Sequence, residues 1–278
     1  MKKRLKILLI VLLCIALAAG SMAAWQFAGN TFTDARTLTR AFGASHTLIA
    51  HRGYSAKYPQ NTLPAFTAAA QAGFDGFEFD IHTAKDGIWV VMHNDTLDEM
   101  TDGEGRIADY TYEELQQFTV DAGNGIERYP ELNIPTLEDA LSVCDAYDIF
   151  PVIEVKSCID PVLLQDILGA IYAHDLEDRA VIISYNIDYL ETLRALDPDI
   201  RMMYLSKELT AQEADRCAAL GLGADVFFVN FAKMSGALKY AQSLGLEIGA
   251  WTVDFPIVAD FMHLQGIDII TTNRITHK

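Results

Sequence analysis

The chain has 278 residues with 21 basic and 38 acidic side chains, which gives a formal net charge of −17 at pH 7. A body this acidic argues against nucleic-acid binding, because phosphate backbones are bound by basic surfaces. Any anionic substrate must therefore be attracted by a local feature, such as a bound metal ion or a single arginine. Hydrophobic residues make up 51% of the chain, enough for one sizeable core.

Residues 1–29 form a targeting segment. Four of residues 2–6 are basic, and they precede an uncharged run at 7–25 that is rich in Leu, Ile and Ala. This pattern is typical of a signal peptide, with a small-residue cleavage site at 21–23, but the run is also long enough for an uncleaved membrane anchor. The positive-inside rule places the body outside the cytoplasm in both cases. We predict a single N-terminal anchor in the cell membrane, with secretion as the alternative.

After a polar linker at 30–45, strand-like and helix-like segments alternate through one domain predicted over 46–278. The predicted strands are 47–51, 77–82, 89–93, 151–156, 181–184, 202–205, 226–229, 247–253 and 268–271. The predicted helices are 63–72, 137–147, 162–174, 189–196, 211–220, 236–244 and 257–264. This alternation predicts an α/β fold, a closed parallel TIM (β/α)₈ barrel, with a doubly wound open sheet as the alternative. Nine strands for eight positions leave one irregular strand, which we expect in the hairpin at 77–93.

The stretch 76–93 has the most informative polar pattern. Glu78, Asp80 and His82 alternate with apolar residues, so their side chains lie on one face of a strand, and His93 ends the second strand of the hairpin. Two carboxylates on one face must hold a cation or share a proton, because close like charges repel. Hard oxygen ligands of this kind suit Mg²⁺ or Ca²⁺.

Other predicted strands also end in polar or aromatic residues, at the edge where the active sites of such barrels gather. The first strand ends in His51 and Arg52, beside the N-terminus of the next helix, which is a suitable place for a phosphate. The fourth strand contains Glu154 and Lys156, which add a third carboxylate and a second cation. Trp251 lies at the end of the eighth-strand region, where we predict that it forms a wall for the substrate.

Taken together, these segments resemble one known family. Between about Thr47 and Arg274 the chain contains, in order, HRG, P-x-NT, FEFD-x-H-x-x-x-DG-x-x-VV-x-H, IPTLEDAL, VIEVK, AWTVD and DIITTN. This combination resembles the glycerophosphodiester phosphodiesterase family, which are phospholipase C-like phosphodiesterase barrels. The resemblance implies cleavage of deacylated phospholipids to glycerol 3-phosphate and an alcohol. A related branch with similar motifs acts on lysophospholipids or sphingomyelin, as a lysophospholipase D or sphingomyelinase D.

The resemblance also implies roles for individual residues. It assigns three carboxylates to a divalent cation, Ca²⁺ or Mg²⁺: Glu78, Asp80 and Glu154. It assigns acid/base catalysis to His51 and His93, and phosphate contacts to Arg52 and Lys156. Two histidines suit these roles because their ordinary pKa, near ~6.5, allows proton transfer in both directions around neutral pH. His82 shares the carboxylate face, but we expect it not to contact the metal.

Four positions depart from the family pattern. Gln60 stands where Glu is usual, Asn94 and Asn273 stand where Asp is common, and Asp254 replaces a frequent Asn. We expect these changes to affect substrate choice and metal affinity more than the core chemistry. Gln60 alone suggests the alternative of a non-catalytic extracellular binding barrel.

Residues 94–135 lack a strong core pattern and replace a short connection, so we predict a lid-like insertion. This segment has eleven acids against Arg106 and Arg128. A solvated surface loop is the simpler interpretation. The alternative is a surface that favours a cationic headgroup through its charge and through Tyr110, Tyr112 and Tyr129.

Overall fold

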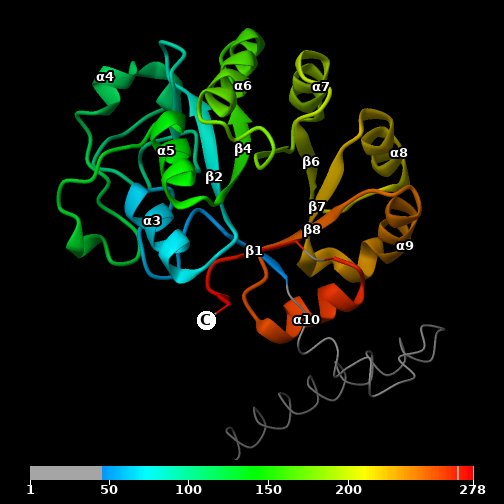
Figure 1. Ribbon diagram of the computed structural model, residues 1–278. Coiled ribbons are helices and arrows are strands. Elements are labelled where there is room, and N and C mark those ends of the chain that lie inside the picture. The colour runs from blue at the N-terminus through cyan, green and yellow to red at the C-terminus, as the bar shows by residue number, and fades with distance from the viewer. Residues whose placement is uncertain (1–45, 268, 278) are drawn as a thin grey trace, which may run out of the picture. The chain divides into compact units, whose positions relative to one another are not determined.

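The structure, a computed structural model, describes residues 46–267 and 269–277. Its strands are β1 (Thr47–Ala50), β2 (Gly76–Thr83), β3 (Trp89–Val91), β4 (Phe150–Ser157), β5 (Val181–Ser184), β6 (Arg201–Ser206), β7 (Gly223–Phe227), β8 (Ile248–Trp251) and β9 (Ile269–Thr272). Eight of them pair in the order β1-β9-β8-β7-β6-β5-β4-β2, and an additional β1–β2 pairing closes the ring (Figure 1). The predicted TIM barrel is confirmed, and the open-sheet alternative is wrong.

The irregular ninth strand is β3, which pairs with β2 in antiparallel orientation. It belongs to the hairpin, as predicted. One predicted strand is displaced: β7 begins at Gly223 and ends at Phe227, and a 3₁₀ turn follows at Phe228–Asn230. The polar Asp225 interrupts the apolar run of β7, so the sequence pattern places the strand too late.

Helices cover the outside of the barrel. They are α3 (Leu63–Ala72), α5 (Leu137–Tyr147), α6 (Leu164–Ala173), α7 (Ile187–Leu196), α8 (Ala211–Leu220), α9 (Phe231–Ser243) and α10 (Pro256–Leu264). Several begin at threonine caps: the Thr62 side chain accepts from the N–H of Ala65, and Thr136 and Thr210 each form a capping box. The predicted helix at 162–174 is shorter, because its first turn is a 3₁₀ turn at Pro161–Leu163.

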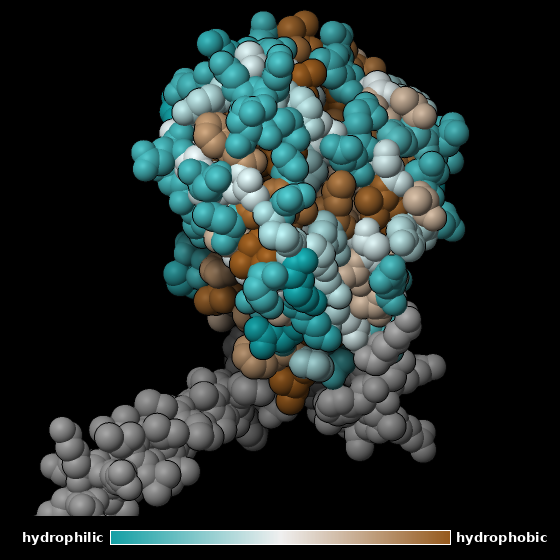
Figure 2. Space-filling model, turned by 90° about the vertical axis from the view of Figure 1, so that its left-hand side faces the viewer, coloured by the Kyte–Doolittle hydropathy of each residue, from teal (hydrophilic) through white to brown (hydrophobic). Residues whose placement is uncertain are grey.

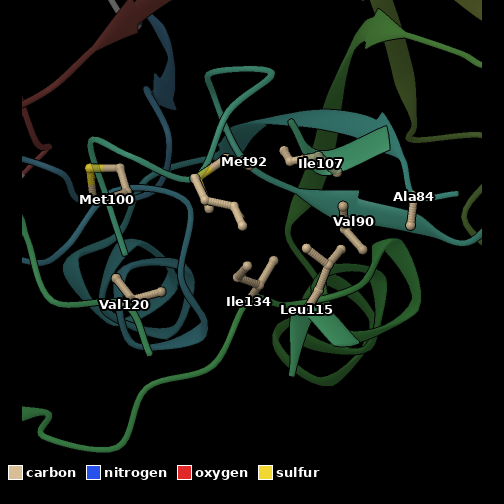
Figure 3. Packing of buried hydrophobic residues seen from close by; sticks show 9 residues of the cluster. Ala84, Val90, Met92, Met100, Ile107, Leu115, Val120 and Ile134 are labelled. Carbon is tan, nitrogen blue, oxygen red and sulfur yellow. The ribbon is translucent and has the colours of Figure 1, made fainter. Parts of the chain in front are cut away.

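The insertion at 94–135 lies beside α3 and α5 and contains the short helix α4 (Tyr112–Leu115) (Figure 1). It packs together with the β2–β3 hairpin around a hydrophobic core, which corrects the expectation from its sequence (Figure 3). The buried residues of this core are Ala84, Val90, Met92, Leu97, Met100, Ile107, Leu115, Val120 and Ile134. Val90 lies in β3 and Leu115 in α4, but most of the others lie in turns and loops or in an isolated bridge such as Thr101–Val120, so their spacing follows neither helical nor strand periodicity.

In the described part of the chain, no helix combines the length and the apolar character needed to cross a membrane. The predicted targeting segment at 1–29 and the linker at 30–45 lie outside the described residues.

Candidate active site

Three carboxylates meet on the neighbouring strands β2 and β4, just beyond the level at which β1 ends. Glu78, Asp80 and Glu154 are buried, and one oxygen of each lies within 4.8 Å of the others. The parallel register places Asp80 directly opposite Glu154. Glu78 lies two residues earlier in the same strand, so the pleat directs both β2 carboxylates to one face. The structure therefore brings together the three residues proposed as metal ligands.

Only some of the oxygens of this cluster have hydrogen-bond partners; one that does is Asp80 Oδ2, which accepts from the Asn61 side-chain amide at 2.8 Å. Glu78 Oε1 is buried without a hydrogen-bond partner among the described residues. The Lys156 ammonium lies 3.1 Å from Asp80 Oδ1 and 2.8 Å from Glu154 Oε1. Buried acceptors without partners are costly, and an all-oxygen set without thiolates fits a hard divalent cation. The residues present therefore fit Mg²⁺ or Ca²⁺.

Mutual repulsion and burial determine the ionisation of the cluster. Burial, with Asp80 and Glu154, raises the pKa of Glu78 well above its usual range. Burial and Asp80 raise the pKa of Glu154 to about 8. Burial opposes the ionisation of Asp80, but Lys156 and Arg52 lower the pKa of its carboxyl below the usual range. A divalent cation in this cluster would favour the ionised forms and displace protons.

The turn after β1 directs Arg52 at the same carboxylates. Arg52 has a φ of 56°, in the left-handed region that residues with a Cβ rarely adopt. Its backbone N–H donates to Glu78 Oε2 at 2.9 Å, and its Nε lies 3.4 Å from Asp80 Oδ2. Its Nη1 donates to Gln60 Oε1 at 2.7 Å. Because Gln60 is neutral, it satisfies one guanidinium donor without cancelling the charge that a phosphate would meet.

The two candidate acid/base histidines lie beside this cluster. His51 Nε2 is 4.0 Å from Glu78 Oε2, and His51 Nδ1 is 2.9 Å from Asn273 Oδ1. Burial, together with the Arg52 charge, lowers the pKa of His51 to about 4. His93 is half-buried, and its Nδ1 lies 2.7 Å from Asn94 Oδ1. Burial also lowers the pKa of His93, although Asp80 partly offsets the effect.

His82 contacts Ser157 and the backbone of His93. Its Nδ1 lies 2.7 Å from Ser157 Oγ, and its Nε2 lies 3.2 Å from the carbonyl oxygen of His93. A neutral ring satisfies both contacts when Nε2–H donates to the carbonyl and Nδ1 accepts from the hydroxyl. Both ring nitrogens of His82 therefore have partners, and one of them is the backbone of His93.

Trp251 belongs to an aromatic group at the ends of β5, β7 and β8. Its ring centroid is 4.9 Å from that of Phe227 and 6.0 Å from that of Tyr185. The indole Nε1 donates to the backbone oxygen of Asp225 at 3.3 Å. Tyr185 and Phe227 are not among the site residues predicted from the sequence. Tyr185 directly follows the predicted strand 181–184 and could have been found as an aromatic residue at a strand end, whereas Phe227 lies inside the predicted strand 226–229 and ends β7 only in the structure.

A cavity of about 450 Å³ adjoins the site on the side of the insertion. Two of its lining residues contact candidate site residues: Gln60 binds the predicted phosphate-binding Arg52, and Asn273 binds the predicted acid/base residue His51. The complete lining is Ser55, Ala56, Gln60, Glu99, Met100, Ala122, Gly123, Asn124, Asn273 and Arg274. It therefore offers hydrogen-bonding groups together with one carboxylate and one guanidinium.

Comparison with known proteins agrees with this geometry. A family model described as the glycerophosphoryl diester phosphodiesterase family matches residues 51–277. The chain belongs to this family. A glycerophosphodiester phosphodiesterase from Caldanaerobacter subterraneus subsp. tengcongensis is 32% identical over 232 residues, covering 81% of this chain and 93% of that protein. The family membership makes the protein a phosphoric diester hydrolase, and the alternative of a non-catalytic binding barrel is set aside.

Solved structures agree in fold and in chemistry. A phosphodiesterase from Oleispira antarctica, in complex with the product sn-glycerol-3-phosphate, matches with a TM-score of 0.75 and 28% identity, covering 84% of this chain and 95% of that one. A glycerophosphodiester phosphodiesterase from Parabacteroides distasonis matches with a TM-score of 0.69 and 28% identity, covering 83% and 94%.

Proposed function

We propose that this enzyme hydrolyses glycerophosphodiesters to sn-glycerol 3-phosphate and an alcohol, with a divalent cation held by Glu78, Asp80 and Glu154. The buried carboxylate cluster, with Arg52 and Lys156 against it, is the observation on which the proposal depends. The sn-glycerol-3-phosphate product bound to the Oleispira antarctica relative supports the substrate class.

The charges of the site suit a phosphodiester. Three ionised carboxylates (−3) and the two cations Arg52 and Lys156 (+2) leave a net charge of −1. A divalent cation changes this sum to +1, which matches the single negative charge of a phosphodiester. In the overall acidic protein, the site then becomes the local positive feature that an anionic substrate requires.

The residues of the site have separate roles in the in-line displacement of the alcohol at phosphorus. A cation held by Glu78, Asp80 and Glu154 would supply Lewis-acid stabilisation of the negative charge that develops on the phosphoryl oxygens, and it would lower the pKa of an oxygen nucleophile. Arg52 and Lys156 bind the phosphate oxygens and orient them. His51 and His93 act as the base and acid pair on the entering and leaving sides, each through its Nε2.

The cavity beside Gln60 and Asn273 is the proposed place for one end of the diester. Glu99 and Arg274 on its wall can meet a headgroup of either charge. The three insertion tyrosines have other contacts. Tyr110 and Tyr112 pack on the core of the insertion, and Tyr129 lies against Arg128 at 5.5 Å. The insertion thus offers less aromatic surface to a choline group than its sequence suggests.

The surface on the insertion side suits small soluble diesters. Figure 2 shows mostly hydrophilic residues on this face, with hydrophobic residues in small separate groups. We therefore prefer glycerophosphodiesters to the lysophospholipid or sphingomyelin substrates of the related branch. We further propose that the enzyme works outside the cytoplasm, because the bases of the targeting segment precede its apolar run. Protease added to spheroplasts should digest the domain, whereas protection equal to that of a cytosolic marker would refute this location.

The test of the proposed function is a metal-dependent assay over a panel of glycerophosphodiesters and lysolipids, with detection of released sn-glycerol 3-phosphate. Chelation should abolish turnover, and Mg²⁺ or Ca²⁺ should restore it in the parent but not in Glu154→Gln. A matched control is Glu138→Gln, which removes an exposed carboxylate that pairs with His174 on the helical surface. Full activity of Glu154→Gln after chelation would refute the metal assignment.

A further inference from the structure

His51 is the first member of a hydrogen-bond chain that continues through Asn273 to Asp254. His51 Nδ1 lies 2.9 Å from Asn273 Oδ1, and Asn273 Nδ2 donates to Asp254 Oδ2 at 2.7 Å. The backbone N–H of Asn273 also donates to Asp254 Oδ1 at 2.8 Å, and the Ser55 hydroxyl donates to Asn273 Oδ1 at 2.9 Å. Each polar atom of the Asn273 side chain therefore has a partner.

The donors and acceptors in this hydrogen-bond chain allow one assignment of the Asn273 amide and of the His51 proton. An ionised carboxylate only accepts hydrogen bonds, so Asp254 requires the NH₂ group of Asn273 to face it. The amide oxygen of Asn273 must then face His51, and the ring nitrogen next to that oxygen must carry the proton. His51 is thereby held as the Nδ1–H tautomer, and its Nε2, on the side of Glu78, is left free to exchange a proton.

The second histidine has a chain of the same kind. His93 Nδ1 lies 2.7 Å from Asn94 Oδ1, and Asn94 Nδ2 donates to Glu99 Oε2. Glu99 belongs to the insertion, so this segment contributes directly to the orientation of an acid/base residue. The two hydrogen-bond chains share no residue and have the same order of groups: imidazole, amide, carboxylate.

We propose that Asn273 with Asp254, and Asn94 with Glu99, are positioning residues that fix both histidines as Nδ1–H tautomers with Nε2 directed at the phosphate. This inference rests on the proposed function for its kinetic consequences. The Nδ1–H bond is present in the neutral ring and in the imidazolium, so each chain holds its ring in both the base and the acid role. The amide also keeps each carboxylate one residue away from the histidine, beside a site that already contains three carboxylates.

Three of these residues, Asn94, Asp254 and Asn273, occupy positions where the sequence departs from the family pattern. The exchange at 254 and 273 is reciprocal, which makes a swap experiment possible. Asn273→Asp should place two carboxylates at a contact of 2.7 Å and lower kcat at least ~10-fold, part of the ~10²–10⁴ that a positioned acid or base contributes. Asp254→Asn should leave the orientation of the Asn273 amide undefined and lower kcat by about 3- to 10-fold.

The double variant Asp254→Asn/Asn273→Asp restores one amide and one carboxylate in a compatible order. Its kcat should return to within about 3-fold of the parent, because residues in one hydrogen-bond chain are non-additive. Metal affinity should change little in all three variants, because neither Asp254 nor Asn273 belongs to the carboxylate cluster. The control Asp260→Asn removes a carboxylate that lies 3.3 Å from His46 Nε2, away from the site, and should leave kcat unchanged. A double variant no faster than the slower single variant would overturn the proposal.

The tautomer itself gives a readout that does not depend on activity. Long-range ¹H–¹⁵N spectra of the full-length protein, with the His51 signals assigned by their loss in His51→Gln, should show a protonated Nδ1 in the parent. Asp254→Asn should show a mixture of tautomers, and the double variant should show protonated Nδ1 again. An Nε2–H tautomer in the parent would refute the proposed role of this hydrogen-bond chain. If the parent shows the expected spectrum but no turnover, the proposed function is refuted and the proposed role of the hydrogen-bond chain in fixing the tautomer is not.

Discussion

Asp225 provides a prediction whose magnitude can be worked from the structure. It lies within β7, is 4% exposed, and its Oδ1 meets no hydrogen-bond partner in residues 46–267 and 269–277. Burial raises the pKa of Asp225 from 3.8 to about 8, and a hydrogen bond from the backbone N–H of Val226 lowers it only in part. The folded protein therefore holds this carboxyl protonated at neutral pH, where the unfolded chain ionises it.

The sign and size of the effect of Asp225 on stability follow from the linkage between protonation and folding. Between pH 4 and 8 the folded state binds more protons at this group than the unfolded state, so its contribution to stability falls as pH rises. The loss is about 1.4 kcal/mol per pH unit, or roughly 4 kcal/mol at pH 7 relative to pH 4. Asp225→Asn removes this dependence. The melting temperature of the variant relative to the parent should therefore rise by about 3–6 °C per pH unit across this range.

Thermal unfolding of both proteins at pH 5, 6, 7 and 8 measures this slope. The hydrogen bonds of the new amide can add a constant difference in melting temperature between Asp225→Asn and the parent, and this difference does not affect the slope with pH. Asp197→Asn is the matched control, because the buried Asp197 carboxylate accepts from the Tyr172 hydroxyl at 2.7 Å and its pKa is lowered. Asp197→Asn should be less stable than the parent at neutral pH, and its melting temperature relative to the parent should not rise between pH 5 and 8. A pH-independent difference between Asp225→Asn and the parent would refute the reasoning.

Three further predictions concern the site and the barrel. Burial and Asp80 raise the pKa of Glu154 to about 8, and the pKa of Glu78 is raised as well. The affinity for Ca²⁺ or Mg²⁺, measured by calorimetry, should therefore fall below pH 8 by ~10-fold per pH unit for each proton that the cation displaces; constant affinity from pH 8 to 6 would contradict this. Arg52→Ala should raise KM and lower kcat together in steady-state assays, because the guanidinium meets phosphate charge in the ground and transition states; a change in kcat alone would contradict a binding role. Gly53→Ala should cost at least ~2 kcal/mol, since Gly53 has a φ of 74° and a Cβ there would lie 2.7 Å from the Ala65 backbone. Gly236→Ala in α9, where a Cβ meets nothing within 4 Å, should instead stabilise by roughly 0.5–1 kcal/mol in the same denaturation assay.

The barrel could be predicted because its strands and helices obey local rules. Capping threonines and regular apolar spacing define most helices, and polar residues at strand ends mark the carboxyl edge of the barrel. β7 was placed too late because Asp225 interrupts its apolar run. The core of the insertion could not be predicted, since residues such as Leu97 and Ile134 meet through turns that follow no period.

The carboxylates and histidines of the site could also be predicted from the sequence, whereas the hydrogen bonds that support them could not. Two-residue spacing showed that Glu78 and Asp80 share a face, and the parallel register then placed Glu154 opposite. No local pattern joins His51 to Asn273, which lies 222 residues later and reaches it only through the pairing of β1 with β9. Long-range hydrogen bonds of this kind depend on barrel closure, so they become visible only in three dimensions.

The most direct test of the account is the release of sn-glycerol 3-phosphate by His93→Ala and His51→Ala, measured beside metal affinity in the same preparations. Each substitution should lower kcat by at least ~10²-fold, the usual contribution of a positioned acid or base, while the affinity for the divalent cation stays close to that of the parent. The double variant should lose much less than the product of the single effects, because the two groups act as one unit. Near-normal turnover in either single variant would contradict the assignment of these histidines as the acid/base pair.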